Sequence, residues 1–139
     1  MRTLEECEEL IRKYPPYNIF EDDKALKEDI EESKKFKEQH GFVDSDTWNL
    51  DYTFACFILP RLCHFRDTTY SVLNDSNIND EIDWYNILDK MVEAFYLVIL
   101  DSRDVSPFNN SYDRLVFDRN IKIKEGLNLF GKYFNDLWD

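Results

Sequence analysis

The chain has 139 residues, a length typical of one domain, and its 43% hydrophobic and 16% aromatic residues are enough to form a core. Its 29 acidic and 17 basic side chains give a formal charge of −12, which disfavours direct nucleic-acid binding because that binding depends on cationic side chains. No stretch is apolar enough for a signal peptide or a membrane span, and three cysteines without a CxxC spacing fit a reduced, cytoplasmic setting. The acidic balance attracts a basic protein partner, although solubility accounts for the same charge.

The first forty residues predict two charged helices. Thr3 and Glu6 have the spacing of a capping box, and the helix that they begin should end near Tyr14, before two prolines. Glu21 to His40 is dense in charges of both signs, and Gly41 supplies the stop. A solvated helix with internal ion pairs explains this pattern, and an acidic contact surface for a partner is the alternative. The acidic residues of that candidate surface are Glu21, Asp22, Asp23, Glu28, Glu31 and Glu32.

The central stretch, Asp44 to Phe65, holds the longest apolar run and predicts a helix that begins at Ser45 or Asp46. Apolar side chains cover most of its circumference, which places it in the interior of a bundle. Pro60 should kink it or divide it into two pieces. Polar and aromatic side chains alternate in its first turns, and we expect a site there that includes Asp46, Trp48, Asn49 and Asp51.

Two more helices are predicted after a polar loop over 67–80. The first runs from Asp80 to Ser102, and the second carries a four-three seam of mostly apolar side chains from Val116 to Leu137. Such a seam packs helices nearly antiparallel, either within one chain or between two copies. Gly126 and Gly131, inside the second helix, indicate a close helix crossing.

The predicted fold is therefore all-α. It is a single-domain helical bundle of about four to five helices over residues 1–139. Charged N-terminal helices occupy 1–41, and 44–139 form the helical core.

The sequence offers little catalytic chemistry. His40 and His64 have no partner at a metal-ligand spacing, and the loop from Asp75 to Asp80 lacks the glycine and the glutamate of a calcium-binding EF-hand. The E-E-x-x-E run at 5–9 is only half of the magnesium motif of all-α nucleotide pyrophosphatases. No catalytic residue, metal or cofactor is predicted, and an enzyme is not favoured.

Three blocks resemble a small, largely uncharacterised bacteriophage protein family. They are W-N-L-D at 48–51 with an apolar helix ending in L-P-R-L at 59–62, W-x-x-I-L-D-K-M at 84–91, and G-L-x-L-F-x-K-Y-F-x-x-L-W-D at 126–139. The resemblance covers roughly the C-terminal two-thirds of the chain. It implies a phage origin and a place in the cytoplasm of an infected bacterium, and it implies no reaction.

The polar side chains in these blocks allow two interpretations. Polar groups inside a bundle must be paired, so the first is an internal network in which Asp51 or Asp89 binds one of the basic members. The second is a polar pocket lined by Trp48, Trp84 and Tyr133. The polar set is Asn49, Asp51, Arg61, Asp89, Lys132 and Asp139.

The leading functional hypothesis is a phage-encoded, non-enzymatic binding protein that inhibits a host factor. A bacterial immune effector, such as a CRISPR or other defence nuclease, is the most attractive target, bound through its basic surface and without nucleic-acid or membrane contact. A homodimer is left open by the regular last helix. An alternative is a small-ligand binder that sequesters a signalling nucleotide, with Arg61, Arg66 or Lys132 on the phosphates. A third hypothesis is a metal-dependent phosphohydrolase.

Overall fold

The computed structural model describes residues 1–16, 27–70, 81–101 and 110–139. Within these ranges the chain has no strand, and the predicted all-α bundle is confirmed. Its elements are α1 (Leu4–Lys13), α2 (Lys27–His40), the 3-10 helix η2 (Asp44–Thr47), α3 (Leu50–Thr68), α4 (Glu81–Asp101), α5 (Asn110–Lys132) and the 3-10 helix η3 (Phe134–Asp136). No helix in the described part of the chain combines the length and the apolar character of a membrane span.

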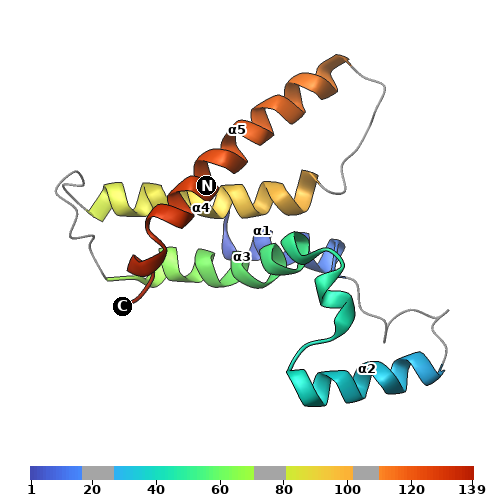
Figure 1. The fold of residues 1–139 in the computed structure, drawn as a ribbon. Coiled ribbons are helices and arrows are strands. Elements are labelled where there is room, and N and C mark those ends of the chain that lie inside the picture. Colours follow the sequence, from blue (N-terminus) through green and yellow to red (C-terminus); the bar gives the residue numbers. More distant parts are fainter. Residues whose placement is uncertain (17–26, 71–80, 102–109) are drawn as a thin grey trace.

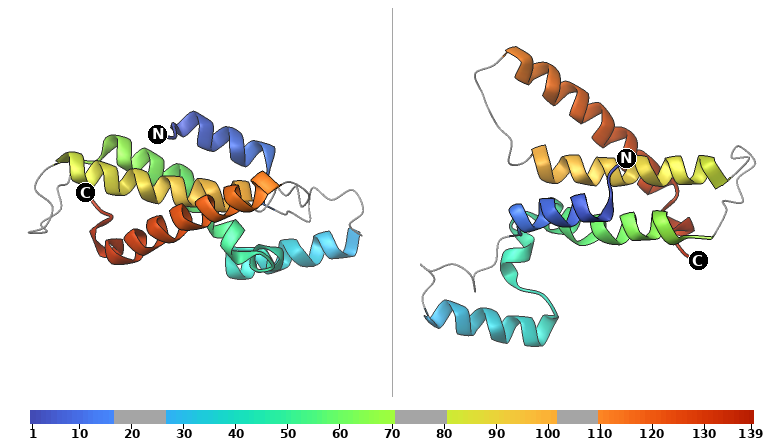
Figure 2. Two further views of the ribbon diagram at one scale, coloured as in Figure 1. Left: turned by 90° about the horizontal axis from the view of Figure 1, so that it is seen from above. Right: turned by 180° about the vertical axis from the view of Figure 1, so that it is seen from behind.

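The core lies between α1, α3 and α4, which pack on one another, and α5 crosses α4 obliquely (Figure 1). The view from behind in Figure 2 shows α1 beside α3 and α4. The largest fully buried side chains include Trp84, Leu59, Leu88 and Met91. By contrast, α2 has no buried residue and stands apart from the other helices (Figure 1).

Two predicted helix ends are confirmed by their hydrogen bonds. The Thr3 hydroxyl accepts from the Glu6 backbone N–H at 3.1 Å, and the Glu6 carboxylate accepts from the Thr3 N–H at 2.8 Å, which completes the capping box of α1. At the end of α2, Gly41 has a φ of 80° and donates its N–H to the Lys37 carbonyl at 2.8 Å. Glycine suits this left-handed position because it has no Cβ.

The central helix begins later than predicted. The Asp46 carboxylate accepts from the Val43 N–H at 3.1 Å, and this bond closes the short turn η2. The α-helix itself starts at Leu50 and continues without interruption through Pro60 to Thr68, so it is not divided there. The prediction that α3 is interior on most of its circumference is also wrong, because Leu50 and Phe57 remain 62% and 53% exposed.

The last helix packs through one side of the predicted seam. In the described part of α5 the buried residues are Arg119 and Gly126, and Tyr133 directly after the helix is buried too. The half-buried members of the seam are Val116, Ile123, Phe130 and Leu137, and its exposed members are Asn120, Leu127 and Phe134. Because α5 crosses α4 at an angle, its buried positions do not follow the seam along the whole helix.

Gly126 marks the crossing of α5 over α4. A Cβ added there would lie 2.3 Å from the Ala94 Cβ and 2.4 Å from the Lys90 carbonyl oxygen. A Cβ at Gly131 would meet nothing within 4 Å. The close approach predicted from the two glycines is thus confirmed at Gly126 and wrong at Gly131.

Gly126→Ala should destabilise the chain. The added methyl group would push α5 off α4, and overpacking of this kind costs about 1–3 kcal/mol. Gly131→Ala is the matched control in the same helix, and it should be neutral or stabilising by up to about 1 kcal/mol through helix propensity. The measurement is the free energy of unfolding in urea. Equal free energies for the two variants would contradict the crossing geometry.

Candidate functional site

A buried arginine joins three segments of the bundle. Arg66 is only 3% exposed. Its Nη1 donates to the Asp89 carboxylate of α4 at 2.7 Å, its Nε to the Asp67 carboxylate at 2.8 Å, and its Nη2 to the Arg2 carbonyl at 2.8 Å. Burial acts to lower the pKa of this guanidinium, but the hydrogen bond and the charge of Asp67 outweigh burial and raise its pKa overall. Arg66 is therefore permanently charged, and each of its three guanidinium nitrogens donates to a group inside the fold.

The internal network expected from the polar blocks thus exists, but with another basic member. Asp89 takes part as predicted, and its partner is Arg66 rather than Arg61 or Lys132. Arg61 is exposed, donates to the Phe57 carbonyl of its own helix at 2.7 Å, and lies 3.9 Å from the centre of the Phe57 ring. Arg66 follows the buried residues Leu59 and Leu62 at helical spacing, and this spacing in the sequence indicates that Arg66 points into the core.

The surroundings of Cys7 and Cys63 favour the neutral thiol. Burial raises the pKa of Cys7 to about 12. Burial also raises the pKa of Cys63, only partly offset by the charge of Arg66, whose Nη2 donates to its sulfur at 3.3 Å. His64, the next residue, is exposed while Cys63 is fully buried, so the two side chains do not form a nucleophile and base.

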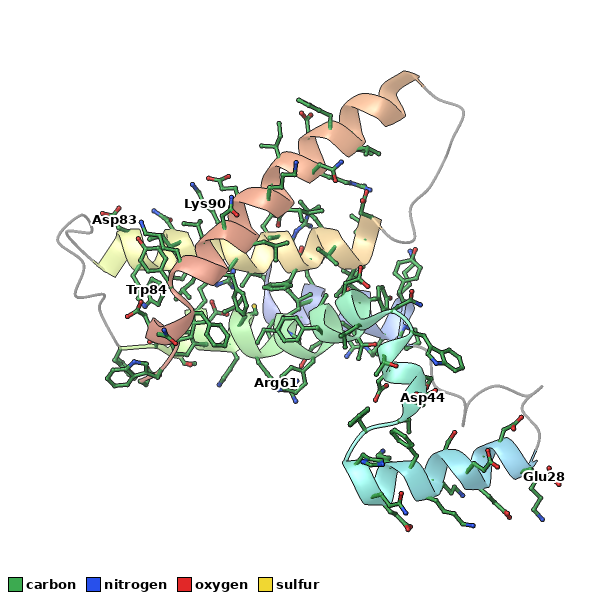
Figure 3. The ribbon with its side chains drawn as sticks, viewed as in Figure 1. Glu28, Asp44, Arg61, Asp83, Trp84 and Lys90 are labelled. Atoms are coloured by element: carbon green, nitrogen blue, oxygen red, sulfur yellow. The ribbon has the colours of Figure 1, made fainter. Side chains whose placement is uncertain are left out.

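The predicted pocket between aromatic rings is not assembled. Trp84 is buried and packs edge-on against Tyr133, with 5.9 Å between ring centroids. Trp48 is 58% exposed and donates its indole N–H to Asp44 at 3.3 Å. Figure 3 labels Asp44 and Trp84 near opposite ends of α3, so the two tryptophans line no common pocket.

The other predicted site residues lie on the surface or at its edge. Asn49 precedes α3 and Asp51 lies in its first turn, and both are exposed. Lys132 is exposed at the end of α5, with its Nζ 5.0 Å from the centre of the Tyr133 ring. Asp46 is half-buried and serves the η2 turn. None of these four residues is placed against the Arg66 network.

Three of the six residues of the predicted acidic surface are described, and all three are exposed. Glu28, Glu31 and Glu32 are exposed in the first turns of α2, whereas Glu21, Asp22 and Asp23 lie outside the described residues. Within described α2, no ion pair joins its acidic and basic side chains, and Glu28, Glu31 and Glu32 take part in none of the salt bridges of the described chain. The internal ion pairs predicted for a solvated helix are therefore not formed by these carboxylates in the described chain.

A polar cavity of about 390 Å³ lies beside α4 and α5, and its charges are mostly neutralised. Arg2 pairs with Glu93 at 3.0 Å, and Lys90 pairs with Glu125 at 2.7 Å. Because these cations already have carboxylate partners within the cavity, it is poorly suited to the phosphates of a nucleotide.

Exposed apolar side chains gather on α3 and α5. At helical spacing, Leu50, Phe54 and Phe57 share one face of α3. Leu127 and Phe130 of α5 are followed by Phe134 of η3. We call these six residues the apolar face. The Phe54 ring lies 6.2 Å from the Phe130 ring, which joins the two helices, and Phe130 lies 5.5 Å from Phe134.

The apolar face continues directly into the core. Phe95 of α4 is buried, and its ring lies 5.8 Å from Phe54 and 5.1 Å from Phe130 in edge-on contacts. At the surface, Phe57 and Phe134 are 53% and 58% exposed. Contiguous exposed apolar patches of this kind mark interaction sites in soluble proteins, since their exposure is otherwise unfavourable.

No protein-family model, curated protein or solved structure matches the chain. In the described ranges, no three His, Cys, Asp or Glu side chains are grouped so that they could hold a metal ion.

Arg66→Met should destabilise the chain by about 3 kcal/mol, because it leaves Asp89 and the Arg2 carbonyl without their buried partner. Arg61→Met is the matched control on the same helix. It removes an exposed guanidinium and should change the stability by less than about 0.5 kcal/mol. Urea unfolding of both variants measures the difference, and similar losses for the two would show that the Arg66 network is not structural.

Cys7 should resist alkylation in the folded chain. A rise of its pKa from 9.0 to about 12 lowers the thiolate fraction at pH 8 about a thousandfold. Iodoacetamide at pH 8, followed by mass spectrometry of the peptides, should label Cys7 rapidly in urea and very slowly without it. Rapid labelling of the folded protein would overturn the assignment of a buried neutral thiol.

Proposed function

We propose that the protein is a non-enzymatic binding protein and that its apolar face docks on a partner protein. The observation that carries the proposal is the continuity of rings from Phe95 in the core, through Phe54 and Phe130, to Phe134 at the surface. Rigid aromatic side chains supported from below are the usual anchors of protein interfaces, because they bury a large area at a small cost in conformational entropy.

The charge of the chain defines the partner. A net charge of −12 repels other acidic surfaces, and the exposed carboxylates of α2 are held by no ion pair within the described chain. A partner with an apolar centre and a basic rim satisfies both features, and opposite charges at a rim chiefly accelerate association. Arg61, beside Phe57, adds a cation that can stack on an aromatic or pair with a carboxylate of the partner.

The resemblance to bacteriophage proteins supports a narrower form of the proposal. In that form the partner is a host factor in the bacterial cytoplasm, with a CRISPR or other defence nuclease as the class, and binding inhibits it. Nucleases present basic surfaces to their substrates, so an acidic protein has the charge to compete for them. Buried cysteines with raised pKa values support a role without covalent chemistry.

Sequestration of a nucleotide receives less support. Arg66 is committed to Asp67, Asp89 and the Arg2 carbonyl, and Arg61 caps the Phe57 carbonyl at the surface. These two cations, predicted for the phosphates, therefore do not converge on one ligand.

Phe57→Ala should weaken partner binding at least about tenfold, as expected when an exposed aromatic side chain that contacts the partner is truncated. The tagged protein would be expressed in a bacterial host, and co-purifying proteins would be quantified by mass spectrometry. Phe117→Ala is the matched control, since Phe117 is 63% exposed on α5 and lies outside the apolar face. A stoichiometric basic protein that is retained by this control, lost with Phe57→Ala and released by salt would support the proposal.

Sedimentation of the purified chain completes this experiment. A concentration-dependent dimer that Phe57→Ala converts to a monomer would show that the apolar face binds a second copy, contrary to the proposal. Equal recovery of the same proteins by both variants would also contradict it.

A further inference from the structure

A hollow of about 490 Å³ lies between α2 and η2. One wall is a single face of α2, where four residues recur at three- and four-residue spacing, and the other is the segment that leads into α3. Figure 3 labels Asp44 on that second wall. We call this hollow the acidic pocket, and its lining residues are Asp29, Glu32, Ser33, Phe36, Asp44, Ser45 and Trp48.

Three carboxylates line the acidic pocket. Asp29, Glu32 and Asp44 line it from both walls, and no Lys or Arg is among its described lining residues. Asp44 accepts the Trp48 indole N–H at 3.3 Å, which satisfies only one of the lone pairs of its carboxylate. Three carboxylates around one concave surface attract a positively charged group.

Ser45 provides a second, independent indication of a ligand. This residue is only 6% exposed, and its hydroxyl oxygen is buried without a hydrogen-bond partner in the described part of the chain. A buried polar atom without a partner is unfavourable, so such atoms are normally paired. A ligand that brings a hydrogen-bonding group into the acidic pocket would remove this cost.

Two aromatic side chains favour a flat cation. Trp48 is 58% exposed, and its indole N–H is held by Asp44, while Phe36 is half-buried on the wall from α2. A guanidinium stacks on aromatic faces and directs up to five N–H donors in its plane to carboxylate and hydroxyl oxygens. An ammonium has three donors and holds its water more strongly, and a quaternary ammonium has no donor for Ser45.

We propose that the acidic pocket receives an arginine side chain of the basic partner. This inference rests on the proposed function, because the arginine belongs to the protein that docks on this chain. Asp29 and Glu32 pair with the guanidinium from α2, Asp44 and Ser45 accept from the other wall, and Trp48 covers its plane. The volume of the hollow also leaves room for the backbone that carries the side chain.

A short capped hexa-arginine peptide serves as the probe, with hexa-lysine for comparison. Binding is followed by the indole N–H resonance of Trp48 in two-dimensional NMR, assigned through Trp48→Phe. The arginine peptide should shift this resonance and bind several-fold more tightly than the lysine peptide. Equal affinity for the two peptides, or no shift at Trp48, would overturn the proposal.

Paired substitutions separate the pocket from the general charge of α2. Asp29→Asn with Glu32→Gln removes two pocket carboxylates and should weaken arginine-peptide binding about tenfold or more. Glu28→Gln with Glu31→Gln makes the same charge change on the same helix outside the pocket and should weaken it less than about threefold. None of the four residues is buried, so both variants should keep the helical circular dichroism of the wild type. Equal weakening by the two pairs would overturn the pocket.

The same variants distinguish failure of the pocket from failure of the proposed function. If the pocket pair leaves partner capture and peptide binding unchanged while Phe57→Ala abolishes capture, the apolar face stands and the arginine site is wrong. If neither Phe57→Ala nor the pocket pair affects capture, both are wrong. Loss of capture with each, and loss of peptide binding with the pocket pair alone, would support both.

Discussion

The arrangement of the bundle depends on one buried guanidinium. Burial of apolar side chains stabilises any packing that excludes water, so these side chains do not by themselves determine which segments meet. Arg66 does, because a buried charge must find acceptors in its own plane. It finds them on α3 at Asp67, on α4 at Asp89 and in the segment before α1 at the Arg2 carbonyl. These contacts fix α3, which carries Leu50, Phe54 and Phe57 of the apolar face, against α4.

Much of the fold follows from local chemistry that the sequence displays. The capping box of Thr3 and Glu6 and the stop at Gly41 involve neighbours in the chain, and both were predicted. The packed face of α5 was predicted only in part. A regular seam from Val116 to Leu137 suggests contact along one line, whereas the buried positions Arg119, Gly126 and Tyr133 lie beside that line. The positions that become buried depend on the angle between α4 and α5, and the periodicity of one helix does not predict that angle.

In the candidate site, too, some features could be predicted from the sequence and others depend on how the helices pack. An internal network around Asp89 could be predicted, because buried polar groups need partners. The identity of its basic member depends on which of two arginines on one helix points inward, and the apolar positions before Arg66 decide this. Glu32 and Trp48 were singled out separately. Their meeting in one hollow requires the chain to reverse after Gly41, and that reversal is a property of the folded chain.

The separation of α2 from the core has an evolutionary consequence. Substitutions are lost from a lineage chiefly when they disturb packing or leave a buried group unpaired, and α2 has no buried residue. Its sequence can therefore drift at little risk to folding, while α3 and α4 remain constrained by Arg66. Under the proposed function, the charges that α2 presents to the partner can therefore change one residue at a time without loss of the fold.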